Sequence, residues 1–578
     1  MLHPDSGAVK PLDAALALPL HGGLGEGLVP LRQLRDLRAA RSGLWLGEGW
    51  SVRSLGAWGW LVGCSFDRDG NVLVDPLAGA PALADRLAVA HWLVRHTWGA
   101  WFAVLVDPRS ESVAILRDPS GLLPLYRRID AGRCLLATAP ALFAQAGMAM
   151  SVSWPHVRQF LQDPERRQRA TCLVGVDELS PGVLYPLEQG AHQVAIWQPA
   201  LHVPASGDVT LAVAAQRVRD CARMVMRAWS GHFGQVVVAA SGGVDSSLVC
   251  AALAVEGRPF ACATVSTRDP SGDETAYVAP LAARLDVSWR AAQYEIAAID
   301  PGAASFARSA RPVGKMFVGE LRRQLGEACA AVGAARVFDG NGGDNVFCFL
   351  HSAAPFLDAW RALGPSRQLA EVFVDLCRLT GADAPTLVRA ILRQWWRRQL
   401  SARRPPNLAL LAGPGETAAS LPLTDWEAQV PMTATGAWAH LRLIEAAQHH
   451  VHGLDDPLRF SPLFSQPLVE TCLGIPTWVW CQGGINRAPA RAAFAAELPA
   501  AITGRVAKAG PDTVMRAVFA RDRVRLRAML RDGLLAGQGL LDLAAIDAAL
   551  ALDPQADDDR IYRLLDLVEA EAWARSWS

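Results

Sequence analysis

The sequence has little lysine. Of the 56 basic residues, only Lys10, Lys315 and Lys508 are lysines, and arginine supplies the remaining positive charge. A lysine offers a compact, mobile ammonium group that a guanidinium fork does not replace, so a lysine near a predicted site is a candidate for chemistry. The 56 acidic residues bring the formal net charge to zero, which argues against a nucleic-acid-binding protein that depends on a broad positive field.

Long apolar runs are also missing. No stretch of about 18 uncharged apolar residues occurs, and the N-terminus has no basic-then-apolar signal pattern. We therefore expect a soluble, cytoplasmic protein with no membrane partner. The 11 cysteines include no CxxC pair and show no regular spacing, so we expect reduced, buried thiols rather than a zinc site or a disulfide framework.

Two secondary-structure patterns divide the 578 residues. Residues 1 to about 40 show no clear period, and we expect an irregular arm there. From about Leu44 to Pro199, short alternating runs predict an antiparallel, β-rich domain, and we place the end of this domain at residue 205. Residues 206–578 show helices that alternate with short buried strands and then become dominant. The buried strands are expected at Val236–Ala240, Phe260–Val265 and Arg336–Asp339. This alternation predicts a parallel sheet covered by helices, with ligands at the carboxyl ends of the strands.

The most informative motif follows the first of these strands. Its sequence is Ser241-Gly-Gly-Val-Asp-Ser-Ser247, and a helical pattern comes next. Glycines let the backbone approach an anion, while hydroxyl groups and the helix N-terminus supply donors. No Gly-Lys-Ser/Thr follows the glycines, so this is not a Walker A loop. The motif resembles the pyrophosphate loop of ATP-pyrophosphatases. This resemblance implies nucleotide binding by Ser241, Gly242, Gly243, Asp245, Ser246 and Ser247.

A second motif, Phe338-Asp-Gly-Asn-Gly-Gly-Asp-Asn-Val-Phe347, ends another predicted strand. Asp344 in this motif and Asp245 in the first loop offer two carboxylates, which together with phosphate oxygens suit Mg²⁺. The adjoining strand ends are expected to complete the nucleotide site. The additional candidates are Gly340 and Gly342 in the second motif, and Val265 and Ser266 between the two loops.

The order of these motifs resembles the synthetase domain of the asparagine synthetase superfamily. Arg459–Glu470 resembles the RxPFLDxxLVE-type segment of that superfamily, and Arg491–Lys508 resembles its LP-xx-I-xx-R-xx-K stretch. The resemblance implies an α/β, adenine-nucleotide α-hydrolase-like (PP-loop) domain with a helical C-terminal part over residues 206–578, and ATP and Mg²⁺ as cofactors. It also implies that Lys508 acts with Asp245 and Asp344 in catalysis, as a cation facing the activated carboxyl group.

Three earlier segments resemble the class II glutamine amidotransferase domain: Trp98–Asp107, Leu116–Tyr126 and Gly175–Gly182. This implies an α+β, Ntn-type, β-rich sandwich for residues 1–205. Those amidotransferases use an N-terminal cysteine as the nucleophile, whereas residue 2 here is Leu2 and the first cysteine is Cys64. Without that thiolate, glutamine hydrolysis has no nucleophile. We therefore expect an inactive amidotransferase-like domain.

Superfamily members that lack this cysteine include β-lactam and carbapenam synthetases and the macrolactam synthetases of lasso peptides. The segments GNGGDNVF and FSPLFSQPLVE are most similar to the lasso-peptide cyclases. This resemblance implies a ligase that adenylates an Asp or Glu side chain of a short, leader-free ribosomal precursor peptide. The peptide's own N-terminal amine then forms an isopeptide bond, and AMP and pyrophosphate are released. A leader-peptide protease and a leader-recognition protein are the further implied partners.

Two other functions remain open on the sequence. One is a small-molecule amide synthetase, which makes asparagine from free ammonia or a lactam of the β-lactam type. The other is a non-catalytic scaffold, which the presence of Asp245, Asp344 and Lys508 disfavours.

Several positions near the motifs allow more than one interpretation. Asp273 and Glu274 either cap a helix N-terminus or belong to the site, and Lys315 is equally open. Asparagine and β-lactam synthetases have an acidic residue before the RxP-type proline, but Leu458 stands at about that place here, with Asp455 and Asp456 nearby. The general base is therefore not assigned.

The run His449-His-Val-His452 raises the question of a metal site. Neighbouring histidines on a helix face different sides, and zinc sites usually have three or four ligands. A metal site at this run is therefore not favoured.

Overall fold

The computed structural model describes residues 51–130, 133–187, 191–204, 209–396, 406–413, 435–454, 456–505, 510–556 and 558–578. For three strands before residue 51, and for residues 130, 133 and 271, it describes the backbone alone. Within these ranges, no helix is both long enough and apolar enough to cross a membrane.

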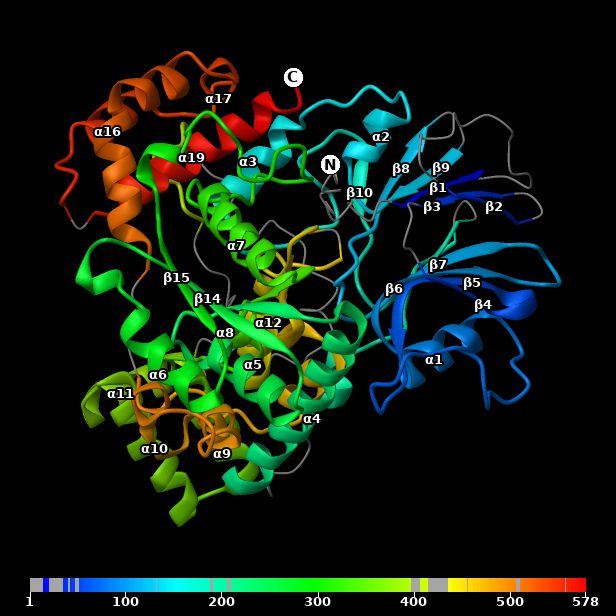
Figure 1. The fold of residues 1–578 in the computed structure, drawn as a ribbon, viewed down its shortest axis with the longest axis horizontal. Helices are drawn as coiled ribbons and strands as arrows, with labels where there is room; N and C mark the ends of the chain where they lie inside the picture. The colour runs from blue at the N-terminus through cyan, green and yellow to red at the C-terminus, as the bar shows by residue number, and fades with distance from the viewer. Residues whose placement is uncertain are drawn as a thin grey trace, which may run out of the picture.

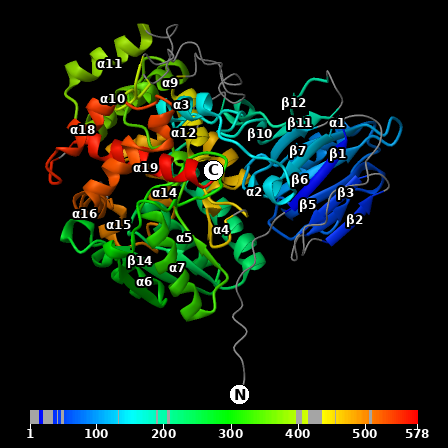
Figure 2. The same ribbon diagram turned by 90° about the horizontal axis from the view of Figure 1, so that it is seen from above.

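Two six-stranded antiparallel sheets form the N-terminal part, on the right of Figures 1 and 2. The first, in the order β10-β8-β9-β1-β3-β2, contains β1 (Ala14–Pro19), β2 (Arg35–Ala39), β3 (Ser42–Leu46), β8 (Tyr126–Asp130), β9 (Arg133–Ala137) and β10 (Val176–Glu178). The second, in the order β12-β11-β7-β6-β5-β4, contains β4 (Val52–Ser54), β5 (Gly59–Phe66), β6 (Trp98–Val106), β7 (Val113–Arg117), β11 (Val183–Pro186) and β12 (Val194–Ala195). Short helices accompany them: α1 (Arg86–His96), α2 (Ala141–Gln145) and α3 (Trp154–Gln162).

Residue alternation along β9 lets the first sheet contribute to two cores. Successive side chains of a strand point to opposite faces. Accordingly, Cys134 and Leu136 pack in one core with strands β5–β7, whereas Leu135 and Ala137 pack in another core with helices near the C-terminus. The first sheet is therefore held between the second sheet and the C-terminal helices.

The expected irregular arm at residues 1–40 is wrong, because it contains β1 and β2. β1 lies inside the first sheet and pairs with both β9 and β3. Its sequence, AALALP, has the alanine and leucine content of a helix rather than a strand. Pairing with two neighbouring strands determines its conformation, and tertiary context of this kind overrides local preference.

The C-terminal part contains a five-stranded parallel sheet in the order β15-β14-β13-β16-β17. Its strands are β13 (Val236–Ala239), β14 (Phe260–Ser266), β15 (Trp289–Gln293), β16 (Arg336–Phe338) and β17 (Arg459–Phe460). The chain proceeds from β13 to β15 and then returns to β16 on the other side of β13. The strand order thus reverses between β13 and β16, which is where open α/β sheets bind ligands.

Helices surround this sheet and extend to the C-terminus (Figure 1). Those around the strands are α4 (Leu211–Phe233), α5 (Val244–Val255), α6 (Thr275–Leu285), α7 (Val318–Val332) and α8 (Gly343–Val346). The later ones are α9 (Ala354–Leu363), α10 (Arg367–Thr380), α11 (Ala384–Trp396), α12 (Thr435–Ala447), α13 (Gln466–Leu473), α14 (Ala488–Ala493), α15 (Ala500–Thr503), α16 (Asp512–Arg531), α17 (Leu534–Gly537), α18 (Leu543–Leu550) and α19 (Asp559–Arg575). Helices α16, α18 and α19 share their core with β9 and so join the two parts of the molecule.

Candidate active site

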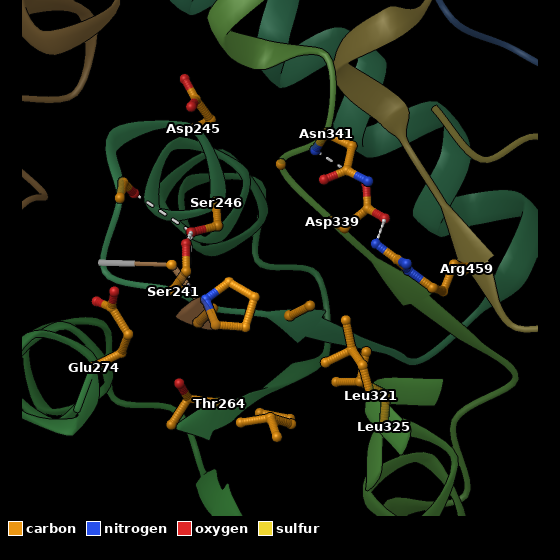
Figure 3. Close-up of a pocket in the computed structure, with 18 of the residues that line it drawn as sticks. Ser241, Asp245, Ser246, Thr264, Glu274, Leu321, Leu325, Asp339, Asn341 and Arg459 are labelled. Atoms are coloured by element: carbon orange, nitrogen blue, oxygen red, sulfur yellow. Dashed lines mark hydrogen bonds and ion pairs between the residues drawn. The ribbon is translucent and has the colours of Figure 1, made fainter. Parts of the chain in front are cut away.

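The loops after β13 and β16 meet at the carboxyl edge of the parallel sheet and border a cavity of about 380 Å³. Figure 3 shows Ser241 and Ser246 on one side of this cavity and Asp339 and Arg459 on the other. The volume lies in the usual range of roughly 300–1,000 Å³ for ligand pockets. We call this space the nucleotide cavity, after the sequence motif beside it.

The first loop turns tightly into α5. Gly242 has a φ of +60°, which glycine adopts without a steric cost, and a Cβ there would lie 2.3 Å from the Cβ of Tyr277. The backbone N–H of Ser241 donates to Ser246 Oγ at 3.2 Å, which ties the two ends of the loop together. The loop therefore presents backbone at the N-terminus of α5, an arrangement that favours phosphate.

Two glycines let the second loop lie directly against the first. A Cβ on Gly340 would lie 2.6 Å from Ser246 N, and a Cβ on Gly343 would lie 2.5 Å from the Cβ of Asp245. Any larger side chain would push the loops apart. The glycines therefore set the spacing between Asp245 and the neighbouring Asp344.

The carboxylates of Asp245 and Asp344 converge on one nitrogen of Arg487. Asp245 Oδ2 lies 2.8 Å from Arg487 Nη1, and Asp344 Oδ1 contacts the same atom. Two carboxylates that share one cation are also placed to share a divalent ion, and Mg²⁺ typically takes one or two protein carboxylates plus phosphate and water oxygens. In the described ranges no cluster of three or more His, Cys, Asp and Glu side chains could hold a metal. Asp245 and Asp344 are placed to hold Mg²⁺ together with phosphate oxygens of a nucleotide.

Glu274 supports the first loop through Arg505. Buried Glu274 contacts the guanidinium with both oxygens, at 2.5 Å from Nη1 and 3.0 Å from Nη2. Arg505 Nη1 also donates to the Ser241 carbonyl at 3.1 Å. Exposed Asp273, in contrast, accepts hydrogen bonds from Thr275 N at 2.9 Å and Thr275 Oγ1 at 2.6 Å. Asp273 thus has the capping role, whereas Glu274 lies at the cavity.

The structure brings most of the predicted nucleotide-binding residues to one place. Those that border the cavity are Ser241, Gly243, Asp245, Ser246, Val265, Gly340, Gly342 and Asp344. Gly242, Ser247 and Ser266 lie behind its wall: Ser247 is fully buried, and Ser266 Oγ accepts a hydrogen bond from the Glu274 N–H at 3.3 Å. Lys508 and Asp455 lie outside the described residues.

A second cavity, of about 730 Å³, lies between the two parts of the molecule, and we call it the chamber. The N-terminal part contributes Gly121, Leu122, Pro124, Tyr126 and Arg167 to its wall. Segments of residues 305–322 and 448–459 form the remainder, apart from Asn341. Four residues border both the chamber and the nucleotide cavity, so the two spaces adjoin. These residues are Leu321, Asn341, His450 and Arg459.

A buried carboxylate joins the chamber wall to the N-terminal part. Glu178 of β10 contacts Arg311 of the chamber wall at 2.6 Å and also pairs with Arg117 and Arg167. Burial alone would raise the pKa of Glu178, but the three guanidinium groups outweigh it and hold that pKa well below its usual range. Lys315, also at the chamber, pairs with Asp566 of α19. It therefore belongs to the chamber wall and not to the nucleotide cavity.

Asp456 is the described carboxylate closest in sequence to the expected place of a general base. It lies 2.6 Å from Arg322 Nη1 and 3.1 Å from His452 Nδ1, and it accepts the backbone N–H groups of Leu458 and Arg459 at 2.9 and 3.0 Å. Burial favours a raised pKa, but His452 and Arg322 outweigh it and place the pKa of Asp456 far below its usual range. It is an ionised anchor of the loop, with its oxygens already engaged.

Cys64, the first cysteine of the chain, lies in β5 within the core. Burial raises the pKa of its thiol far above the ordinary value, against a smaller opposing effect of Arg53. A buried thiol that stays protonated is neither nucleophilic nor accessible. Cys64 therefore cannot take over glutamine hydrolysis.

Arg487 and Arg505 are site residues that the sequence motifs did not predict. Arg505 stands three positions before Lys508 in the segment already singled out, and that proximity was the available signal. Buried Arg491, earlier in this segment, donates to the carbonyls of Thr503 and Arg505 at 2.7 and 2.8 Å. This fixes the backbone that leads toward Lys508. Arg487 carried no comparable signal, because the chain is rich in arginine.

The parallel sheet, its two glycine-rich loops and the converging carboxylates define a phosphate-binding α/β protein. A sequence profile described as asparagine synthase matches residues 232–575, more than half of the chain. The chain belongs to the asparagine synthase family. It is accordingly an ATP-dependent ligase that forms amide bonds, and the family uses ATP, generally with Mg²⁺.

Two solved structures show a weaker likeness. The allosteric regulatory enzyme of purine biosynthesis is 10% identical, with 55% of this chain and 83% of that chain covered and a TM-score of 0.21. Glutamine phosphoribosylpyrophosphate amidotransferase from B. subtilis, complexed with ADP and GMP, is 10% identical, with 58% and 76% covered and a TM-score of 0.19. At these scores neither likeness supports a conclusion about this chain. No curated protein matches the sequence.

Proposed function

We propose that this protein is a lasso-peptide cyclase. It adenylates the side-chain carboxylate of an Asp or Glu in a leader-free precursor peptide and joins the activated carbonyl to the peptide's N-terminal amine. The observation that carries the proposal is the chamber of about 730 Å³ that adjoins the nucleotide cavity. Ammonia or a single amino acid needs much less room, whereas a space of this order, in the roughly 300–1,000 Å³ range of ligand pockets, can take the reacting part of a peptide.

The state of Cys64 supports an amine as the nitrogen donor. Glutamine-dependent relatives need a reactive thiolate to release ammonia, and Cys64 is buried with a raised pKa. A substrate that carries its own amine removes the need for glutamine. The resemblance of GNGGDNVF and FSPLFSQPLVE to the lasso-peptide cyclases adds to this support.

In the proposed mechanism, Asp245 and Asp344 would hold Mg²⁺, which would neutralise phosphate charge. The Ser241–Ser246 loop and the N-terminus of α5 orient the phosphates. The substrate carboxylate then attacks the α-phosphorus, and pyrophosphate leaves. Arg487 supplies positive charge beside the carboxylate pair, and Lys508 is proposed as the further cation that stabilises developing negative charge.

Amide formation depends on placing the amine next to the acyl-adenylate and on keeping water away, since water would hydrolyse it. In this proposal the chamber walls hold the amine in place and keep water away from the acyl-adenylate. A cytoplasmic location, a leader-peptide protease and a leader-recognition protein complete the proposal, because the amine must be exposed by leader removal before ring closure.

Mass spectrometry of the leader-free peptide from a neighbouring precursor gene, incubated with enzyme, ATP and Mg²⁺, tests the proposal. We expect a loss of about 18 Da, one water, as the amine and carboxylate of one molecule condense. Asp245→Ala should abolish this loss. Asp220→Ala is the matched control, since Asp220 is exposed on α4 and accepts hydrogen bonds from Gln216 Nε2 at 2.9 and 3.0 Å.

An unchanged peptide mass, together with AMP formed when aspartate and ammonia are supplied instead, would refute the cyclase proposal and indicate asparagine synthesis. Blocking the peptide's N-terminus by acetylation provides a second control. The acetylated peptide retains its carboxylate, so it should still promote ATP–pyrophosphate exchange but should not lose water.

A further inference from the structure

We propose that the chamber holds the attacking amine and that His450 accepts the amine's proton as the amide bond forms. This inference rests on the proposed function and assigns the general base that the sequence leaves open. It makes His450 a catalytic residue of the second half-reaction, after adenylation is complete.

His450 lies where the chamber and the nucleotide cavity adjoin. The acyl-adenylate forms in the nucleotide cavity and the amine approaches from the chamber, so a base for this step must reach both spaces. Of the four residues that border both, Leu321 and Asn341 do not titrate. The guanidinium of Arg459 has donors and no acceptor, and it contacts Asp339 at 2.9 Å. Among the described residues, His450 is therefore the proton acceptor at the junction.

The other chamber histidines do not meet this requirement. His452 borders the chamber alone, and its Nδ1 lies 3.1 Å from Asp456 while its Nε2 lies 3.9 Å from Asp339. His449 also borders the chamber alone, and its Nε2 is buried. Asp456 is ionised and already engaged with Arg322. The junction thus selects His450 from a cluster of three neighbouring histidines.

The backbone holds His450 in place while its side chain stays accessible. The His450 N–H donates to the Ala447 carbonyl at 2.8 Å, immediately after α12. Its carbonyl accepts a hydrogen bond from Asn341 Nδ2 at 3.0 Å, which ties it to the second glycine-rich loop. The residue is exposed and borders both cavities. A fixed backbone with a reachable ring suits proton transfer in a bound complex.

The surroundings favour the neutral ring. Enclosure by the cavity walls lowers the pKa of His450, the positive charges of Lys315, His452 and Arg167 lower it further, and Glu165 opposes them. At pH 7 the imidazole is therefore mostly neutral and can accept a proton. A weak base is sufficient here, because the amine nitrogen becomes positively charged and strongly acidic as its bond to the carbonyl carbon forms.

The proposed step conserves atoms and charge. The lone pair of the neutral amine forms the C–N bond, and the carbonyl π electrons move to oxygen. The nitrogen, now cationic, transfers one proton to the free ring nitrogen of His450. The oxygen electrons re-form C=O and expel AMP by breaking the bond between the carbonyl carbon and the phosphate oxygen. The imidazolium later releases its proton to solvent.

His450→Gln tests the inference by separating the two half-reactions. ATP–pyrophosphate exchange with the N-acetylated peptide reports adenylation, and single-turnover mass spectrometry of the unblocked peptide reports ring closure. We expect exchange within about threefold of the wild type, and ring closure reduced roughly 10²–10⁴-fold, the usual contribution of a general base. The wild-type ring-closure rate should fall more steeply at acidic pH than the rate of the variant, which keeps only the limb of the peptide's own amine. Added imidazole should partly rescue His450→Ala.

His91→Gln is the matched control, since His91 is exposed on α1 and borders neither cavity. Its rates of ATP–pyrophosphate exchange and of ring closure should both equal those of the wild type. The inference is overturned if His450→Gln closes the ring at the wild-type rate with the wild-type pH limb. It is also overturned if exchange falls as much as ring closure, since His450 would then be needed to build the nucleotide site. Failure of the proposed function looks different: the wild type itself would neither exchange with the acetylated peptide nor close the ring.

Discussion

Glu569 of α19 is a buried carboxyl group whose protonation is expected to control the stability of the chamber wall. Its side chain is 3% exposed and accepts hydrogen bonds from Ser305 N at 2.6 Å and Ser305 Oγ at 3.2 Å. The chain packs so tightly here that a Cβ on Gly314 would lie 2.1 Å from the carboxyl. Burial raises the pKa of Glu569 from 4.5 to about 7, with Asp566 adding to the rise and Ser305 and Lys315 opposing it.

This pKa predicts the sign and size of a pH effect on unfolding. Between pH 4.5 and about 7, native Glu569 keeps its proton while the unfolded chain has lost it, so the native state becomes less stable as pH rises. Each pH unit of this interval lowers the free energy of unfolding by about 1.4 kcal/mol. Relative to a side chain that does not titrate, the wild type should therefore lose about 3 kcal/mol across the interval, with no further loss above it.

Urea unfolding of the wild type and Glu569→Gln, at a series of pH values from 4.5 to 8, measures this loss. The difference between the two free energies of unfolding is the informative quantity, because all other titrating groups are common to both proteins. Asp559→Asn, an exposed change at the start of the same helix, is the control and should give a flat difference. The reasoning is refuted if the difference between wild type and Glu569→Gln is also independent of pH. The carboxyl group would then have the same pKa in the folded and unfolded states.

Two further substitutions follow from the contacts. Glu178→Gln leaves three buried or partly buried arginines without their shared counter-charge. Because breaking such a buried pair typically costs about 3–5 kcal/mol, we expect the free energy of unfolding to fall by this amount. A fall below about 1 kcal/mol in urea unfolding would contradict this. Gly343→Ala forces a Cβ to within 2.5 Å of the Asp245 Cβ, and a displacement of about 1 Å at a reacting site can cost about 10²-fold. ATP–pyrophosphate exchange should fall accordingly while circular dichroism stays unchanged, and full exchange activity would disprove the tight approach.

The two loops of the nucleotide cavity could be predicted because their information is local. In each, an apolar strand is followed at once by glycines that permit close approach and by a carboxylate. Ser241, Asp245 and Gly340 therefore identify the carboxyl edge of the sheet without any knowledge of distant contacts. The parallel sheet follows from the same alternation of strands and helices.

Residues that reach the site from distant segments could not be found in this way. Arg487 stands 242 positions after the Asp245 that it contacts, and His450 stands 109 positions after the Asn341 that anchors it. Arg487 has no local pattern, because arginine is common throughout this chain. His450 belongs to the run His449–His452, but that run raised only the question of a metal site. Strand β1 was missed for a related reason, since its partners β9 and β3, and not its own residues, make it a strand.

The contacts of the N-terminal sheets give these sheets a structural role that needs no reactive thiol. Glu178 of β10 neutralises Arg311 on the chamber wall, and Gly121 to Tyr126 form part of that wall. Removing the sheets would open the chamber to water and leave Arg311 without its carboxylate. Hydrolysis competes with amide formation at any acyl-adenylate exposed to water. The N-terminal part is therefore best understood as a wall of the proposed peptide site, a role that depends on its shape and charge and not on thiol chemistry.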